Sequence, residues 1–313
     1  MENSKIEIIT LLNERKTLNQ KMESMIYGSI EVRERDDKKY LYVHKRIDGI
    51  KRTSYVGEYT EDLYFGINKN NAEVKEIKKK LRVINKMLEA LDFSDIPLSD
   101  NVKLNIDFAK RNLVDTIYKQ AVLEGIAVTF LDTETIIEGG KINNVSADDV
   151  QKINNLKHAW QLVLDNGVLA SPTDYNLLCI INRLVEEGFY YNAGAIRSVP
   201  VSIGGTRWKP DLPIESVVKE ELAFLLNNPS FDVYARAIKS LLYIMRKQIF
   251  IDGNKRTAVI FANHILISAG AGLITIPDDM VNEYKKLLIN YYETNEDTKI
   301  YAFIEKNCLT KLS

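Results

Sequence analysis

The chain has 313 residues, of which 45% are hydrophobic and 27% charged, and its formal net charge at pH 7 is -1. This composition is typical of a globular protein, and the balanced charge indicates neither a nucleic acid nor a membrane as a partner. No apolar run reaches the roughly 18 residues of a membrane span, and the first residues lack the pattern of a secretion signal. Two cysteines without metal-ligand spacing, Cys179 and Cys308, favour free thiols in a reducing compartment. We therefore expect a cytoplasmic protein that binds neither a membrane nor nucleic acid.

Residues 1–93 predict a small α+β module made of a helix, a three-stranded meander and a second helix. Apolar residues recur along 5–26 at helical spacing, and along 71–91 they recur at every third or fourth position. The second helix is expected to pack antiparallel on the first. Between the helices, alternating and β-branched runs predict strands. The strands cover 28–34, 39–46 and 51–57, with turns at Asp36-Asp37 and Asp48-Gly49.

The surface of this meander is rich in basic residues interleaved with tyrosines, and it leaves two interpretations open. Such a pattern fits a nucleic-acid-binding face, but outward charges on a small antiparallel sheet are more often a solvated surface. We favour the solvated surface. The helical hairpin also fits a protein partner or a second copy of the chain. The residues concerned are Arg33, Arg35, Lys38, Lys39, Lys45, Arg46, Lys51, Arg52, Tyr40, Tyr42 and Tyr55.

Beyond a polar linker at 94–100, residues 100–313 predict a second, mainly helical domain. One strand pair is expected in it, over Val199–Trp208, with Gly204 and Gly205 at the tip of a hairpin. The helices expected from apolar periodicity cover 101–124, 132–138, 146–166, 172–187, 213–227, 231–247, 254–269 and 278–308.

The run 248–257 (Gln-Ile-Phe-Ile-Asp-Gly-Asn-Lys-Arg-Thr) combines groups that suit phosphate. A turn that opens onto a helix leaves backbone N–H groups free at the positive end of the helix dipole. Two cations add positive charge there, and a carboxylate is a candidate ligand for a divalent metal. Taken alone, the run is equally a solvated loop before a helix. The five consecutive positions are Asp252, Gly253, Asn254, Lys255 and Arg256.

This run resembles the motif of the Fic/Doc (Fido) family, His-x-Phe-x-Asp/Glu-Gly-Asn-Gly/Lys-Arg, with Gln248 in place of the histidine. Gly194–Arg197 and Val201–Gly205 resemble the family's Gly-x-x-Arg segment and its substrate-binding flap. Thr135–Gly139 resembles its N-terminal inhibitory helix, here expected near 132–139. The resemblance covers about residues 100–313. It implies a mainly α protein, with a Fido-type helical domain and a β-hairpin flap after the α+β module.

The resemblance also implies a protein adenylyltransferase, which binds ATP and Mg²⁺ and transfers AMP to a hydroxyl side chain of a target protein. Asp252 would hold Mg²⁺, and Arg256 would contact phosphate. Phe250 would anchor the loop. Gly253, Asn254 and Lys255 would form the anion hole. The flap residues that would dock the target by main-chain pairing are Ile203, Gly204, Gly205, Thr206, Arg207 and Trp208, although Trp208 equally suits an anchor on the core.

Three departures from the family pattern bear on activity. A glutamine amide such as that of Gln248 accepts no proton at neutral pH, so general-base catalysis, typically worth about 10²–10⁴-fold, would be lost. His264 is expected to pack along its helix instead of replacing the base. Val259 stands where many AMP-transferring members have a second arginine. Glu134 stands where the inhibitory motif has Ser or Thr. Its glutamate, Glu138, either reaches Lys255 or Arg256 in a regulatory contact or simply ends a helix.

Several functions therefore stay open. The first is an impaired AMP-transferring enzyme. The second is a pseudoenzyme that binds a nucleotide or a protein without catalysis. The third is phosphate transfer, because the Asn-Lys-Arg-Thr-Ala run also resembles the Doc branch, which would suggest a toxin–antitoxin role. Expected partners are a target protein and a second copy of the chain, through either the N-terminal module or the Fido domain.

Overall fold

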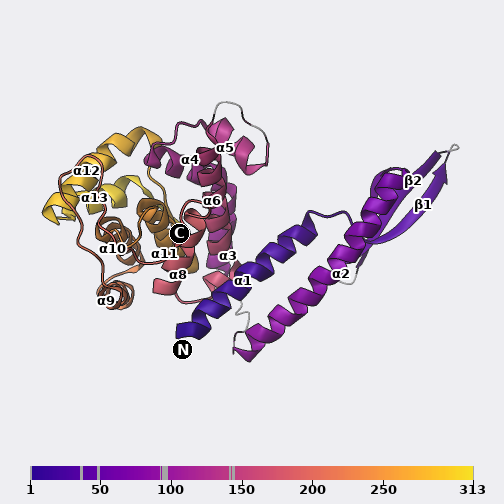
Figure 1. Ribbon diagram of the computed structural model, residues 1–313, viewed down its shortest axis with the longest axis horizontal. Coiled ribbons are helices and arrows are strands. Elements are labelled where there is room, and N and C mark those ends of the chain that lie inside the picture. Colours follow the sequence, from indigo (N-terminus) through magenta and orange to yellow (C-terminus); the bar gives the residue numbers. More distant parts are fainter. Residues whose placement is uncertain are drawn as a thin grey trace. The chain divides into compact units, whose positions relative to one another are not determined.

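The computed structural model describes residues 2–35, 38–47, 50–91, 93, 98–140, 142 and 145–312. The chain divides into two compact units, Met1–Ser94 and Asp95–Ser313 (Figure 1). The protein is mainly helical, as predicted, and none of the described helices is both long and apolar enough to cross a membrane.

In chain order, the first unit is a helix, a three-stranded antiparallel sheet and a second helix, which confirms the predicted meander. Strand order is β1-β2-β3, with Val32 opposite Leu41 and Val43 opposite Ser54. The turns expected at Asp36-Asp37 and Asp48-Gly49 lie outside the described residues. The elements are α1 Glu2–Glu23, β1 Ser29–Arg35, β2 Lys38–Ile47, β3 Ile50–Glu58 and α2 Glu61–Ala90.

One face of this sheet is covered by α2. Leu41 and Val43 alternate with outward-facing residues along β2 and pack with Ile67 of α2 into a small core. Helix α2 begins ten residues before the predicted start, because the Thr60 side chain accepts a hydrogen bond from the Leu63 amide and caps the first turn. The apolar spacing after Asn71 identified only the later part of the helix.

The second unit is built around α11 (Figure 1). The residues of this helix are nearly all buried. Helices α3, α4, α6, α8 and α10 pack against it. The helix predicted over 101–124 is two helices divided at Asn112, and the one predicted over 278–308 is divided at Asn295, which adopts a φ of 62°. The helices are α3 Asp100–Arg111, α4 Leu113–Glu124, α5 Phe130–Ile137, α6 Ala147–Val163, α7 Asn166–Leu169, α8 Tyr175–Val185, α9 Glu215–Asn227, α10 Val233–Lys247, α11 Asn254–Ser268, the 3-10 helix η1 Asp278–Met280, α12 Val281–Thr294 and α13 Thr298–Asn307.

The strand pair predicted over Val199–Trp208 is wrong, because this segment is a loop with a turn at its tip. Proline supplies no N–H to a ladder, and Pro200 and Pro210 flank the two arms. The buried guanidinium of Arg197 joins the arms instead, by donating hydrogen bonds to the carbonyls of Val199, Pro210 and Asp211. The unit's described strand pair is β4 Gly272–Ile274 with β5 Leu309–Lys311. Its strands are too short and too far apart in sequence for the pattern to reveal them.

Candidate functional site

The loop between α10 and α11 carries the phosphate-suited run. Helix α10 ends at Gln248, which adopts a φ of 48°, and α11 is preceded by Gly253 with a φ of 72°. Both positions are left-handed, a conformation that favours glycine. Gly253 has a second reason to be glycine, because a Cβ there would collide with the carboxylate of Glu186. The loop therefore turns sharply and brings its backbone against a buried acid.

The side chain of Asn254 holds this loop in shape. Its Oδ1 accepts a hydrogen bond from the Phe250 amide at 2.9 Å, and its Nδ2 donates to the Phe250 carbonyl at 2.8 Å. The same Nδ2 donates to Oε1 of Gln248 at 3.2 Å. The Phe250 ring is buried in the core, as expected of a residue that anchors the loop. The side chain of Asn254 is thus fully used in holding the loop, and its backbone N–H is the group that remains available to a ligand.

The N-terminus of α11 has no side-chain cap. Within the described chain, the backbone amides of Asn254, Lys255 and Arg256 donate to no acceptor, whereas that of Thr257 already bonds to the Gly253 carbonyl. The carboxylate of Asp252 accepts from the Gly253 amide at 2.7 Å and is half-exposed beside the open amides. Free N–H groups at the positive end of a 15-residue helix form a site for an anion.

Arg256 is the buried cation of this site, with a side chain only 4% exposed. Its Nη2 lies 2.7 Å from Glu186 and 3.7 Å from Asp252, and its Nε lies 3.9 Å from Glu124. No described acceptor satisfies its Nε or Nη1 by a hydrogen bond. A buried donor without an acceptor costs about 1–3 kcal/mol. An anionic ligand that reached these nitrogens would remove that cost.

Two glutamates that no motif indicated complete the electrostatics. The pKa of Glu186 is raised to about 7, mainly by burial and also by the charges of Asp252 and Glu124, against the attraction of Arg256. Glu124, at the end of α4, lies 3.5 Å from Nζ of Lys255. Neither glutamate has a local sequence signal, because each comes from a different helix. Sequence reasoning therefore missed the acids that surround the two motif cations.

Glu138 takes no part in this cluster. It is the exposed C-terminal cap residue of α5, followed by Gly139 with a φ of 81°. The contact expected with Lys255 or Arg256 is not formed, since among the described residues those cations pair with Glu124, Glu186 and Asp252. The geometry matches the other expectation, a glutamate that ends a helix. Its regulatory role stays a prediction.

Gln248, at the position of the family histidine, is held by its neighbours. Its Nε2 donates to the Met245 carbonyl at 2.5 Å, and its Oε1 accepts from Asn254. Arg197 fixes the backbone by donating from Nε to the Gln248 carbonyl at 2.6 Å. The side chain offers no proton acceptor at neutral pH. Gln248 is the C-terminal cap residue of α10, and its side chain stabilises the loop through these hydrogen bonds.

No histidine replaces it within the described chain. His264 is fully buried in α11, where Nε2 lies 3.1 Å from the Val168 carbonyl and Nδ1 lies 2.9 Å from the Thr173 hydroxyl. Burial lowers the pKa of His264 to about 4, so the ring is neutral and donates from Nε2. The expectation that His264 packs along its helix is confirmed. Its role is structural.

The loop 203–208 is attached to α12. Trp208 stacks on Tyr292 with ring centres 5.7 Å apart. The guanidinium of Arg246 also lies over the Trp208 ring, 4.7 Å from its centre. Thr206 donates to Glu293 at 2.6 Å. These contacts fit the interpretation of Trp208 as an anchor. The residues left exposed for a partner are Gly204, Gly205 and Arg207, with the half-buried Ile203 beside them.

No group of three or more His, Cys, Asp or Glu side chains in the described chain could by itself hold a metal ion. Mg²⁺ commonly uses one or two carboxylates together with substrate phosphates. Asp252, half-exposed beside the open amides of α11, meets that requirement in the presence of a phosphate ligand. The site residues thus fit a metal that arrives with its phosphates.

Comparison with known proteins agrees with this geometry. Residues 172–266 match the family model of the Fic/DOC family. The chain carries a Fic/DOC domain. No curated protein matches the chain. The match includes the loop 252–256, Glu186 and all of α8, α9 and α10, whereas Glu124 of α4 lies outside the matched residues.

Solved structures show the same fold. A Fic-domain-containing signalling protein from Bacteroides thetaiotaomicron aligns with a TM-score of 0.53 at 18% identity, over 67% of this chain and 87% of that one. Fic-1 from C. elegans aligns with a TM-score of 0.53 at 18% identity, over 77% and 76%. A Fic family protein from Desulfovibrio desulfuricans aligns with a TM-score of 0.52 at 15% identity, over 67% and 72%.

Proposed function

We propose that this Fic/DOC domain binds ATP with Mg²⁺ at the start of α11 and that Gln248 impairs its transfer of AMP to a target hydroxyl. The observation that carries the proposal is the pairing of an uncapped helix N-terminus with a buried arginine whose Nε and Nη1 lack hydrogen-bond acceptors. Phosphate oxygens are acceptors for both sets of donors. Proteins of the family commonly transfer nucleotides or other groups to proteins, which is consistent with this proposal.

Each residue of the loop has a part in this proposal. The amides of Asn254, Lys255 and Arg256 would donate to phosphate oxygens, and the side chain of Arg256 would contribute Nε and Nη1. Asp252 would hold Mg²⁺, which neutralises phosphate charge. Lys255, only 3.5 Å from Glu124, would have to exchange that partner for a phosphate. The acids around the cations therefore set the affinity for the nucleotide.

Transfer to a protein hydroxyl needs a group that takes the hydroxyl proton. Gln248 cannot do so, and its amide is already engaged with Met245 and Asn254. Loss of general-base catalysis lowers a rate by about 10²–10⁴-fold. We therefore expect nucleotide binding with little transfer.

The deciding experiment compares the natural chain with Gln248→His in Mg²⁺ buffer with α-labelled ATP, with self-modification and cell lysate as acceptors. Label in the histidine variant alone would support an impaired AMP-transferring enzyme. The matched control is Gln248→His combined with Arg256→Ala, which should not label. Calorimetric titration of the natural chain with ATP and Mg²⁺ tests binding directly, and no heat of binding at millimolar nucleotide would overturn the proposal.

A second candidate is phosphate transfer of the Doc kind, favoured by Val259. This residue stands where many AMP-transferring members have a second arginine, and here it is fully buried, so no side chain at this position contacts a γ-phosphate. The same assay with γ-labelled ATP distinguishes phosphate transfer from AMP transfer. Label from γ-labelled but not α-labelled ATP would replace AMP transfer by phosphate transfer.

A further inference from the structure

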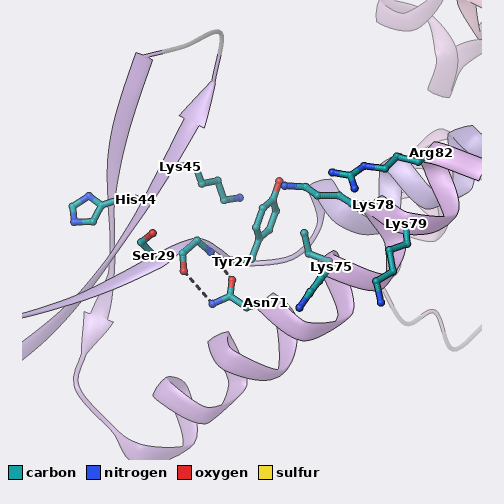
Figure 2. A pocket seen from close by; sticks show the side chains of 11 residues that line it. Tyr27, Ser29, His44, Lys45, Asn71, Lys75, Lys78, Lys79 and Arg82 are labelled. Atoms are coloured by element: carbon teal, nitrogen blue, oxygen red, sulfur yellow. Dashed lines mark hydrogen bonds between the residues drawn. The ribbon is translucent and has the colours of Figure 1, made fainter. Parts of the chain in front are cut away.

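The first unit contains a basic hollow of about 690 Å³ between strand β2 and helix α2 (Figure 2). Figure 2 shows the ring of Tyr27 between Lys45 of β2 and the cations of α2. This hollow lies in the N-terminal unit, in a different part of the chain from the Fic/DOC domain. The side chains that matter for its chemistry are Tyr27, Lys45, Lys75, Lys78, Lys79 and Arg82.

Most of these cations have no counter-charge. Within the described chain, Lys45, Lys75, Lys78 and Arg82 form no ion pair, and Lys79 pairs only with Glu76 one turn earlier, at 2.7 Å. Burial, followed by the charge of Lys78, lowers the pKa of Lys45. Like charges held close together repel, and a bound polyanion relieves that repulsion.

The ring of Tyr27 helps to hold two of these charges at the hollow. The Nζ of Lys45 lies 3.7 Å from the ring centre and the Nζ of Lys78 lies 5.7 Å from it. A cation over an aromatic face is attracted by its quadrupole. The aromatic ring therefore holds both ammonium groups at the hollow, and it leaves them able to donate hydrogen bonds to a ligand.

The wall of the hollow is fixed by hydrogen bonds. The Asn71 side chain accepts from the Gly28 amide at 2.8 Å and donates to the Gly28 carbonyl at 3.0 Å, as the dashed lines in Figure 2 show. Gly28 has a φ of 142°, and a Cβ there would press against the His44 carbonyl. These contacts attach the start of β1 to α2 and set the position of Tyr27 next to them.

The cations of α2 form a row. Lys75, Lys78, Lys79 and Arg82 are spaced i, i+3, i+4 and i+7, so they share one face of the helix, and the exposed Lys86 continues it. At 1.5 Å per residue, the row from 75 to 86 is roughly 16 Å long. This stretch holds six cations and one acid. A linear row fits a linear polyanion, and a nucleic-acid strand carries roughly one charge per 3.4 Å of helix axis.

We propose that the N-terminal unit binds the phosphate backbone of nucleic acid along this hollow and the cation row of α2. Apart from Val74 and the ring of Tyr27, which Lys45 covers, the side chains that line the hollow end in charged or polar groups, and most of them are cations. Lysine and arginine contacts of this kind are typical of binding to a phosphate backbone. The net charge of -1 led to the opposite expectation, because a sum over the whole chain conceals a local concentration of cations. Among the basic meander residues whose side chains the structure describes, Lys45 is the one that lines this hollow.

The test measures fluorescence anisotropy of labelled 20-nucleotide single-stranded RNA, single-stranded DNA and duplex DNA with the full chain, at 50 to 300 mM salt. The variant Lys75→Gln/Lys78→Gln removes two charges from the row. The matched control Lys69→Gln/Lys80→Gln removes two charges from another face of the same helix. All four side chains are exposed, and circular dichroism checks that both variants stay folded.

We expect binding that weakens steeply with salt, and at least a tenfold weaker affinity in the row variant only. Its slope of log affinity against log salt should fall by about 1.4 to 1.8, at roughly 0.7–0.9 per lost phosphate contact. The nucleic acid that binds with the highest affinity, among single-stranded RNA, single-stranded DNA and duplex DNA, is identified as the preferred ligand. Absence of binding at 50 mM salt, an equal loss in the control variant, or equally strong competition by poly-glutamate would each overturn the proposal.

Discussion

The two basic regions of this molecule use their cations in opposite ways. At the start of α11, Arg256 is buried and surrounded by Glu124, Glu186 and Asp252. The cations along α2 are mostly exposed and, in the part of the chain that the structure describes, mostly without an ion pair. A buried charge is paired in folded proteins, so the first region is suited to a single anion at a fixed position. Exposed charges keep their hydration and act additively, so the second region is suited to an extended partner.

The largest effect is expected from Arg256→Ala, which removes the buried cation. Glu186 would lose its counter-charge and Glu124 would keep only Lys255, and we expect a loss of about 3 kcal/mol in the free energy of unfolding together with loss of ATP binding. Urea unfolding and calorimetry measure the two effects. Arg207→Ala, at an exposed loop position that forms no ion pair with a described residue, is the control and should leave both unchanged. Equal effects of the two substitutions would contradict the contrast between buried and exposed cations.

The pH dependence of stability should come partly from Glu186. Its pKa in the folded protein is raised to about 7 from the usual 4.5, so the folded state binds its proton more tightly than the unfolded state does. The contribution to stability is therefore full below pH 4.5 and is lost as the pH rises towards 7, with a total on the order of 1–3 kcal/mol.

Glu186→Gln tests this assignment, because it removes the titrating group and keeps the shape. The difference in unfolding free energy between the natural chain and the variant should change between pH 4.5 and 7 and stay level above about pH 8. Urea unfolding at several pH values measures it. A difference that does not vary over this range would show that Glu186 titrates normally.

Glu124→Gln should raise the affinity for ATP by about 5- to 10-fold. Glu124 competes with phosphate for Lys255 and Arg256, and the neutral amide competes less. Glu138→Gly is the informative comparison, because the family resemblance predicts that it raises nucleotide binding, whereas the geometry leaves Glu138 exposed and apart from both cations. Calorimetric titration decides between them. A gain in the Glu138 variant alone would mean that the resemblance, and not Glu124, identifies the competing acid.

The smallest effect is expected in the first unit from Asn71→Ala. This substitution removes both hydrogen bonds to Gly28, and we expect about 1–2 kcal/mol less stability and an affinity for nucleic acid that falls only a few-fold. Asn68→Ala is the control, since its side chain bonds only to the Tyr64 carbonyl on the same helix. A tenfold or larger loss of nucleic-acid affinity would contradict this expectation. It would mean that binding at the hollow depends on the Asn71–Gly28 hydrogen bonds, as the shape of the loop before α11 depends on those of Asn254.

The difference between the two regions also explains how much of each was predictable. The row on α2 follows from residue spacing along one helix, so its alignment is present in the sequence. The hollow is not, because Tyr27 and Lys45 reach α2 only through the fold of the sheet. Around Arg256, the loop was recognised from its motif, whereas Glu124 and Glu186 come from α4 and α8 and have no local signal.

By itself, the sequence determined the three-stranded meander, most of the helices and the position of the phosphate-suited loop, because these depend on local periodicity and short-range turn chemistry. The tertiary structure alone decided that Val199–Trp208 is a loop held by Arg197 and that β4 pairs with β5. It also decided which acids neutralise Arg256. The physical reason is the same in each case: burial and ion pairing depend on residues that lie far apart in the chain and meet only when the core forms.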